Sequence, residues 1–212
     1  MESIQEATRA VEVAGSFDVV VCGAGPAGIA AALASARAGA STLLLESQGC
    51  LGGVWTAGLL SWIIDAGDKG GIMAELVEAI DRGGLRTVMQ DETYATAYDP
   101  EKMKRLLEQM CLQAGMRIRL HTFVAAAQVN DAGRLTHVLT ESKSGRETWS
   151  GQVFIDCTGD GDLAARAGCG FDFGDSETLE PPARGANRWF EQAQRRSLER
   201  GGRTPSAAGA SR

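Results

Sequence analysis

Short apolar runs and a helical pattern alternate along the first part of the chain. The run Phe17–Cys22 is apolar and β-branched, and Thr42–Glu46 has the same apolar character, so both predict strands buried on both faces. Residues 29–38, between them, are small and favour a helix, which Gly39 ends. Strand, helix and strand in this order predict a βαβ unit with a right-handed crossover.

Two amphipathic helices and several short strands follow. Residues 72–82, and a helix that begins at Pro100, carry apolar residues three and four positions apart, as helices with one buried face do. Further runs predict strands at 116–121, 124–129, 135–141, 147–149 and 153–157, and a short helix at 163–167. Three of these strands form a meander. The pattern predicts an α/β fold, a Rossmann-like parallel sheet with a small antiparallel β meander, incomplete at the C-terminus.

Composition divides the chain into three segments. Residues 1–16 precede the first strand and are expected to be flexible, and residues 17–180 form the predicted α/β domain. Residues 181–212 hold seven Arg, two Glu and one Leu, and no Asp, Lys, Val, Ile or Met. A segment with so little apolar surface cannot offset its ordering entropy, so we expect a disordered basic tail. The alternative is an out-of-frame end, because GC-rich codons in a wrong frame give Arg, Ala, Gly, Pro and Ser.

Composition and charge narrow the classes of function. The 212 residues are 44% hydrophobic and 23% charged, as in ordinary globular proteins. A net charge of −6 argues against nucleic acid as the main partner. No apolar stretch is long enough for a membrane helix, and the N-terminal residues lack the features of a secretory signal. Five cysteines without a CxxC pair favour reduced thiols in a cytoplasmic protein.

A glycine-rich turn lies between the first predicted strand and its helix. Residues 23–28, Gly-Ala-Gly-Pro-Ala-Gly, fit the G-x-G-x-x-G pattern of dinucleotide-binding turns. Gly23 permits the tight turn, Gly25 lets a pyrophosphate approach the backbone, and Gly28 lets the helix pack closely on the strand. The helix N-terminus offers N–H groups and a partial positive charge to the phosphates.

An acid stands where such a turn needs one. Glu46 follows Gly28 by 18 residues, at the end of the second strand, where a carboxylate can accept hydrogen bonds from ribose hydroxyls. The same carboxylate would repel a 2′-phosphate. These residues alone leave NAD and FAD both open as the ligand.

Three motifs resemble those of the FAD-dependent oxidoreductases of the glutathione-reductase-like superfamily, and they follow one another in the order found in that family. The first is residues 17–47, which are similar to the opening of these proteins. The second is the Cys-Leu-Gly-Gly loop at 50–53, and the third is Phe-Ile-Asp-Cys-Thr-Gly-Asp-Gly-Asp at 154–162. The third motif resembles a subgroup that includes the flavin subunit of heterodisulfide reductase. The resemblance covers roughly residues 17–175.

The resemblance implies FAD as the cofactor and a role for each matching position. The pyrophosphate would be bound by the glycine turn and the Gly-Gly loop, the adenosine ribose by the acid and the serine after it, and the adenine by the backbone of a later strand. The implied cofactor-binding residues are Gly23, Gly25, Pro26, Ala27, Gly28, Glu46, Ser47, Gly52, Gly53, Val124, Thr158, Gly159 and Asp160.

For several other residues, the sequence is compatible with either a functional or a structural role. Trp55 and Trp62 suit either the flavin ring or the core, and Cys50 lacks a resolving cysteine nearby. Asp156, Asp160 and Asp162 could hold a metal, but the favoured interpretation is that Asp162 caps the short helix and Asp160 points toward the cofactor. The two histidines, His121 and His137, are expected in strands, with structural roles.

The sequence favours a flavoprotein that passes a hydride or electrons through bound FAD, with no metal and with an unknown small-molecule substrate. It names no catalytic acid or base. Family members continue to a substrate-binding region and a C-terminal segment that completes the FAD domain, so the resemblance implies a truncated member, or one completed by a partner chain. The alternatives are a non-catalytic flavin-binding fragment and an NAD-binding module.

Overall fold

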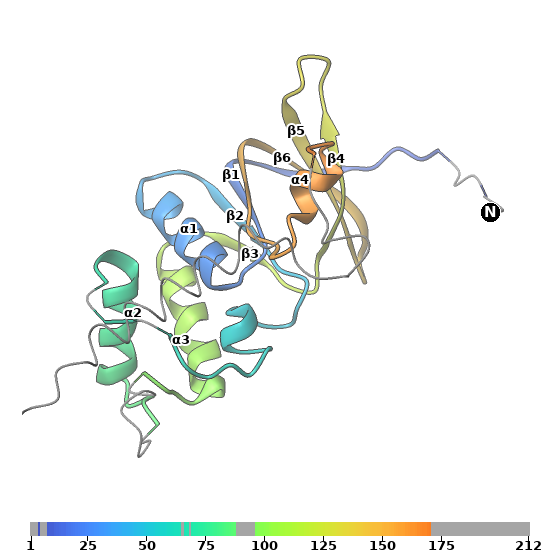
Figure 1. Ribbon diagram of the computed structural model, residues 1–212. Coiled ribbons are helices and arrows are strands. Elements are labelled where there is room, and N and C mark those ends of the chain that lie inside the picture. Colours follow the sequence, from blue (N-terminus) through green and yellow to red (C-terminus); the bar gives the residue numbers. More distant parts are fainter. Residues whose placement is uncertain (1–3, 5–7, 65, 68, 88–95, 171–212) are drawn as a thin grey trace, which may run out of the picture. The chain divides into compact units, whose positions relative to one another are not determined.

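A six-stranded sheet is the frame of the part of the chain that the computed structural model describes (Figure 1). The described residues are 4, 8–64, 66–67, 69–87 and 96–170, and nearly all of them fall in one compact unit, which ends at Cys169. The strands are β1 (Val13–Cys22), β2 (Thr42–Leu45), β3 (Arg117–Arg119), β4 (Phe123–Val129), β5 (Leu135–Ser142) and β6 (Gly145–Asp156). The helices are α1 (Pro26–Arg37), the short 3-10 turn η1 (Gly53–Trp55), α2 (Gly71–Arg82), α3 (Pro100–Gln113) and α4 (Asp162–Arg166).

The sheet is parallel on one side and antiparallel on the other. Its order is β3-β2-β1-β6-β5-β4, and the pairs β3–β2, β2–β1 and β1–β6 are parallel. The pairs β6–β5 and β5–β4 are antiparallel. The fold is therefore the predicted Rossmann-like α/β sheet with a β meander.

The structure has one strand where the sequence predicted two. The pattern predicted separate strands at 147–149 and 153–157, because the residues between them at 150–152, Ser-Gly-Gln, have no apolar side chains. The structure has a single strand, β6, which pairs with β5 along its first half and with β1 from Thr148 to Asp156. A Cβ at Gly151 would come within 2.9 Å of the Phe154 ring and 3.0 Å of the Val20 side chain, so glycine here leaves room for these two side chains.

The first strand also begins earlier than expected. β1 starts at Val13, whereas the apolar pattern predicted a start at Phe17. Val13 pairs with Thr148 of β6, and the register shifts between Val13 and Gly15. The extension depends on a partner far along the chain, which local sequence does not reveal.

The last four residues of β1 and all of β2 are buried on both faces of the sheet, which explains the apolar sequence of these segments. On one face, Val21 and Leu44 pack with residues of the three long helices, and on the other, Val20 and Leu43 pack with residues of β4–β6 and α4. Trp149, fully buried on the second face, donates a hydrogen bond to the Thr140 hydroxyl at 2.9 Å.

The helices follow the predicted signals closely. α2 and α3 cover the predicted ranges, and the Asp99 carboxylate caps α3 by accepting from the N–H groups of Glu101 and Lys102. α1 begins at Pro26, three residues before the predicted start, because proline at the first helical position is compatible with the helix. No helix in the described ranges is long and apolar enough to cross a membrane.

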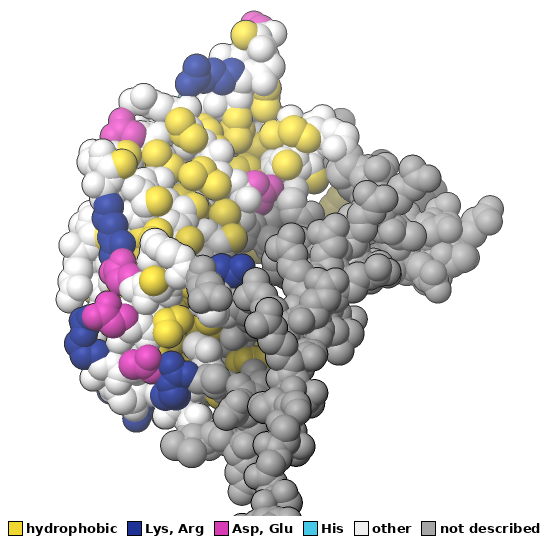
Figure 2. Space-filling model, turned by 60° about the vertical axis from the view of Figure 1, so that its left-hand side comes forward, with side chains coloured by type: hydrophobic (Ala, Val, Ile, Leu, Met, Phe, Trp, Pro, Cys, Tyr) yellow, Lys and Arg dark blue, Asp and Glu magenta, His cyan; other side chains and the backbone are white. Residues whose placement is uncertain are grey.

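Charges of both signs lie on the surface. On the face drawn in Figure 2, basic and acidic side chains alternate along one edge, and apolar side chains lie across the middle. Neither sign dominates this face, in keeping with the modest net charge of −6.

Candidate functional site

The turn between β1 and α1 is shaped by three glycines with different surroundings. Gly23 has φ +94°, and a side chain there would overlap the carbonyl oxygen of Cys157 on the neighbouring strand. A side chain at Gly28 would overlap the carbonyl oxygen of Gly23. At Gly25, in contrast, a Cβ would have no atom within 4 Å. Two glycines therefore permit close packing, and the third leaves open space.

That open space lies at the N-terminus of α1. Gly25 is the N-cap residue, and no side chain caps this helix end. Pro26 occupies the first turn, which contains no acidic residue. The first N–H groups of a helix have no partner within the helix, so this end is suited to an anion.

A cavity of about 380 Å³ opens beside this helix end, and its size is within the range of small-ligand sites. Five segments line it: the glycine turn, the end of β2, the Gly-Gly loop, the start of β4 and the turn between β6 and α4. Ten of the thirteen predicted cofactor-binding residues line it, namely Gly23, Gly25, Pro26, Ala27, Glu46, Ser47, Gly53, Val124, Thr158 and Gly159.

The other three predicted residues lie outside the cavity lining. Gly28 is buried in the contact between α1 and β1, and Gly52 is buried, with Thr56 where a side chain would be. Asp160 is exposed and does not line the cavity. The first two act on the shape of the site through packing.

Seven residues that the sequence did not single out as cofactor-binding also line the cavity: Leu45, Gln48, Val54, Thr122, Phe123, Cys157 and Asp162. Most of them adjoin a predicted residue in the chain, so widening each motif by one or two positions would have found them. Among the described residues that line the cavity, Phe123 is the only aromatic one.

The carboxylate of Glu46 points to the glycine turn. One of its oxygens accepts a hydrogen bond from the N–H of Ala24 at 2.6 Å. The other accepts from the hydroxyl of Ser47 at 3.1 Å and from the N–H of Gln48 at 2.7 Å. A carboxylate has about four acceptor positions, so this buried group retains room for a ligand hydroxyl.

The Gly-Gly loop packs directly on the glycine turn. The N–H of Gly52 donates to the carbonyl of Ala24 at 2.8 Å. A side chain at Gly53, where φ is +52°, would come within 2.9 Å of the Cα of Gly25. Backbone of the Gly-Gly loop thus packs against the backbone of the glycine turn at Ala24 and Gly25.

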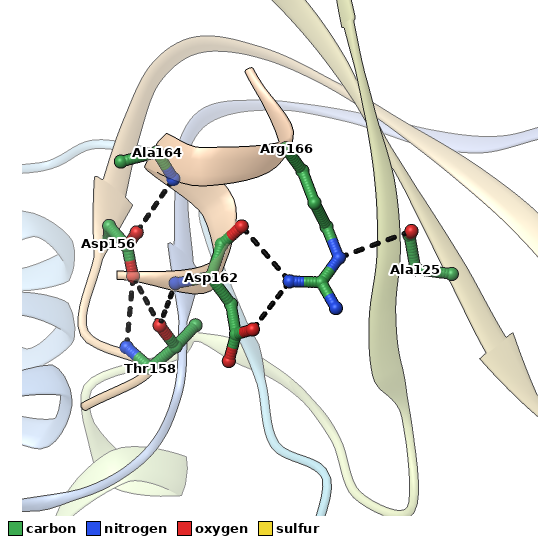
Figure 3. A network of polar contacts seen from close by, with 6 residues as sticks. All are labelled: Ala125, Asp156, Thr158, Asp162, Ala164 and Arg166. Carbon is green, nitrogen blue, oxygen red and sulfur yellow. Dashed lines mark hydrogen bonds and ion pairs between the residues drawn. The ribbon is translucent and has the colours of Figure 1, made fainter. Parts of the chain in front are cut away.

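The turn between β6 and α4 is held by a side chain (Figure 3). The carboxylate of Asp156 accepts from the N–H and hydroxyl of Thr158, at 3.0 and 2.7 Å, and from the N–H of Ala164 at 2.8 Å. Burial raises the pKa of Asp156, but these hydrogen bonds outweigh burial and bring it below the ordinary value. The carboxylate is therefore ionised over the neutral range and fixes the turn.

The expected cap of α4 was wrong. The sequence assigned this role to Asp162, but Asp156 reaches the N–H groups of the first turn instead. Asp162 is itself the first residue of α4, and its carboxylate pairs with Arg166, one turn later, at 2.5 Å. Asp160 is exposed and is not among the described residues that line the cavity, and its expected place toward the cofactor stays a prediction.

The remaining candidates take structural positions. Trp55 packs against the core, Cys50 lies 3.9 Å from the hydroxyl of Thr56, and neither lines the cavity. His121 has φ +51° and lies outside the strands, contrary to expectation, whereas His137 is in β5 as predicted. Among the described residues, no group of three or more potential ligands could hold a metal ion.

The family of the chain follows from its match to a family model. The model described as FAD dependent oxidoreductase matches residues 18–202. This range is most of the chain, so the chain belongs to the FAD-dependent oxidoreductases, and its cofactor is FAD. The match extends into the segment 181–212, which was predicted to be a tail and lies outside the described residues.

Solved structures show the same fold at low sequence identity. THI4 from Thermovibrio ammonificans has a TM-score of 0.53 at 15% identity, with 70% of this chain and 59% of that chain covered. The myxobacterial FAD-dependent halogenase CndH has 0.51 at 17%, covering 67% and 37%. OxyS anhydrotetracycline hydroxylase from Streptomyces rimosus has 0.50 at 23%, covering 76% and 35%. The aligned part is thus between about a third and three fifths of each of these proteins, and a search of curated proteins found no significant match.

The residues that line the cavity fit the adenosine diphosphate half of FAD. The open face of Gly25 gives a phosphate access to backbone, and the buried carboxylate of Glu46 adjoins the same turn. Among the described residues that line the cavity there is no Lys or Arg, so the positive charge available to a phosphate comes from the N-terminus of α1 and its backbone N–H groups.

Proposed function

We propose that this chain binds FAD with its adenosine diphosphate half in the cavity described above, and that it serves an oxidoreductase. The observation that carries the proposal is the empty space over Gly25, at the uncapped N-terminus of α1 and next to the buried Glu46 carboxylate. When bound, the flavin supplies hydride or electron transfer, and the protein binds and orients it.

Each part of the cavity has a role in this proposal. The pyrophosphate lies over Gly25 and Gly53, where no side chain intervenes. The ribose hydroxyls donate to the remaining acceptor position of Glu46, whose charge also disfavours a 2′-phosphate. The flavin then extends away from the cavity past the Gly-Gly loop.

The finer family assignment also belongs to the proposal. The segment Ile-Asp-Cys-Thr-Gly-Asp-Gly-Asp at 155–162 supports a place near the flavin subunit of heterodisulfide reductase. Substrate and electron acceptor would be bound outside the described unit, by this chain or a partner chain.

Gly25 offers a direct test, because the structure supplies a matched control. Gly25 and Gly70 are both N-cap residues of twelve-residue helices with extended backbone, and a Cβ at either position meets nothing. Gly25→Val should therefore fold normally but fill the space for the pyrophosphate, and should weaken FAD binding about 100-fold or more. Gly70→Val should bind FAD as the wild type does.

The measurement is the quenching of flavin fluorescence on titration of each purified chain, with the unfolding midpoint as the check of folding. Equal FAD affinity in both variants would refute the placement of the pyrophosphate. A wild-type chain that prefers NAD over FAD in competition would favour an NAD-binding module, and one that binds neither would favour an inactive fragment.

A further inference from the structure

We propose that the ring of Phe123, held in place by Arg166, is the surface on which the adenine base of the cofactor stacks. The inference rests on the proposed function, since it assigns a residue to one part of the FAD site. The resemblance implied that the adenine meets the backbone at Val124, and the inference goes beyond it by assigning two side chains, those of Phe123 and Arg166, to the base.

The order of groups in the cofactor places the base near the start of β4. The glycine turn is joined to Glu46 by the hydrogen bond from Ala24, and the backbone carbonyl of Glu46 accepts from the N–H of Thr122 at 2.9 Å. A ligand that runs from pyrophosphate to ribose to base therefore passes from Gly25 to Glu46 and then reaches Thr122 and Phe123. Both of these residues line the cavity.

Phe123 is unusual among the aromatic residues of this unit. It remains 49% exposed, whereas the other described aromatic residues of the sheet, Phe17, Trp149 and Phe154, are buried or half-buried. An exposed phenylalanine at the edge of a ligand cavity offers an apolar, flat surface. Every nucleic acid base has a π face, so stacking on such a ring needs no particular hydrogen bonds.

Arg166 fixes this ring from the side of α4. Its guanidinium carbon lies 5.3 Å from the centre of the Phe123 ring, within the range of a cation–π contact. The guanidinium also donates to the carbonyl of Ala125 in β4 at 3.2 Å and to Asp162, through the carbonyl at 3.1 Å and the carboxylate at 2.5 Å. Figure 3 shows Arg166 extending from α4 to the β4 backbone at Ala125, which is two residues after Phe123 in the chain.

The structural alternative is that Phe123 only adds apolar area to the rim of the cavity. Two substitutions separate the alternatives. Phe123→Leu keeps apolar bulk but removes the ring, and Phe123→Tyr keeps the ring. Leu112→Ala is the control, because Leu112 is exposed on α3 and does not line the cavity.

The experiment measures FAD affinity by flavin fluorescence and tests ADP as a competitor of FAD. Stacking on the ring predicts that Phe123→Leu weakens FAD binding roughly 10-fold or more, while Phe123→Tyr and the control stay within about twofold of the wild type. ADP should displace FAD, with a weaker affinity for the Phe123→Leu chain by the same factor. Unchanged FAD affinity in Phe123→Leu, or failure of ADP to displace FAD from the wild type, would overturn the inference.

Arg166 acts through the ring and is a positioning residue, so its test is the coupling between the two positions. Arg166→Met should weaken FAD binding about threefold, and less than that in the Phe123→Leu background, where no ring remains to be held. Fully additive losses would remove Arg166 from the proposal. A wild-type chain that binds no FAD would instead refute the proposed function.

Discussion

Two neighbouring turns border the cavity, and they are fixed in opposite ways. The β1–α1 turn and the β6–α4 turn follow adjacent parallel strands, with Cys22 paired with Asp156. The first turn is shaped by side chains that are absent, because Gly23 and Gly28 have backbone where a Cβ would be. The second is shaped by a side chain that is present, since Asp156 binds three donors. The first turn thereby leaves the backbone of Gly25 open to the cavity, and the second turn is fixed by the Asp156 carboxylate.

The largest loss of stability is expected from a substitution that disrupts the first turn. Gly28→Ala places a Cβ on the carbonyl oxygen of Gly23, in a contact between backbone segments that cannot relax by a change of rotamer. We expect a loss of about 3 kcal/mol or more in the free energy of unfolding. Urea denaturation measures it, and Gly25→Ala, which meets nothing, is the control. A Gly28→Ala chain as stable as the control would contradict the close packing.

A smaller loss of stability is expected from a substitution that removes the carboxylate holding the second turn. Asp156→Asn removes the charge that three hydrogen bonds stabilise and turns an amide N–H₂ toward a donor. We expect a loss of about 2 kcal/mol at neutral pH, in the range of hydrogen bonds to charged groups.

The same variant has a pH signature with a definite sign. Because the pKa of Asp156 is lowered in the folded chain, its contribution is complete above the unfolded-state value, about 3.9, and is lost as the pH falls through the folded value. The stability difference between wild type and Asp156→Asn should be constant from pH 7 to 5 and shrink below pH 4. A difference that persists unchanged at pH 3 would mean that the charge is not the source.

The smallest effect distinguishes the two aspartates around α4. Asp162→Asn weakens only a partly exposed ion pair with Arg166, so we expect a loss of about 0.5 kcal/mol or less. If Asp162→Asn cost as much as Asp156→Asn in the same urea measurement, the capping role would be shared between them.

The two turns also differ in how far the sequence could predict them. Glycine has no side chain, so its effect on a turn can be inferred from the sequence alone. The G-x-G-x-x-G pattern and the acid at position 46 therefore located the first turn. An aspartate in a sequence indicates only that its carboxylate needs donors, and among the three aspartates within seven residues the sequence favoured Asp162 as the cap, which was wrong. Asp156 was chosen by the geometry at the end of β6, which the sequence does not contain.

Long-range partners explain most of the other differences. Val13 joins β1, and residues 150–152 continue β6, because a strand from elsewhere in the chain pairs with them. Phe123 and Arg166 are 43 positions apart, and nothing in either local pattern indicates that they meet. Apolar periodicity, in contrast, located α2 and α3 to within a residue, because it reflects burial against any core.

The late arrival of β6 has a consequence for synthesis on the ribosome. β1 can pair with β2 as soon as residue 45 has emerged, but its other edge waits for residues 148–156. Until then the β6–α4 turn that borders the cavity beside the glycine turn has not been made. The free edge of β1 is also open to pairing with other chains. A nucleotide added during translation should therefore protect this region from proteolysis only after some 160 codons have been read and the last of them has cleared the exit tunnel.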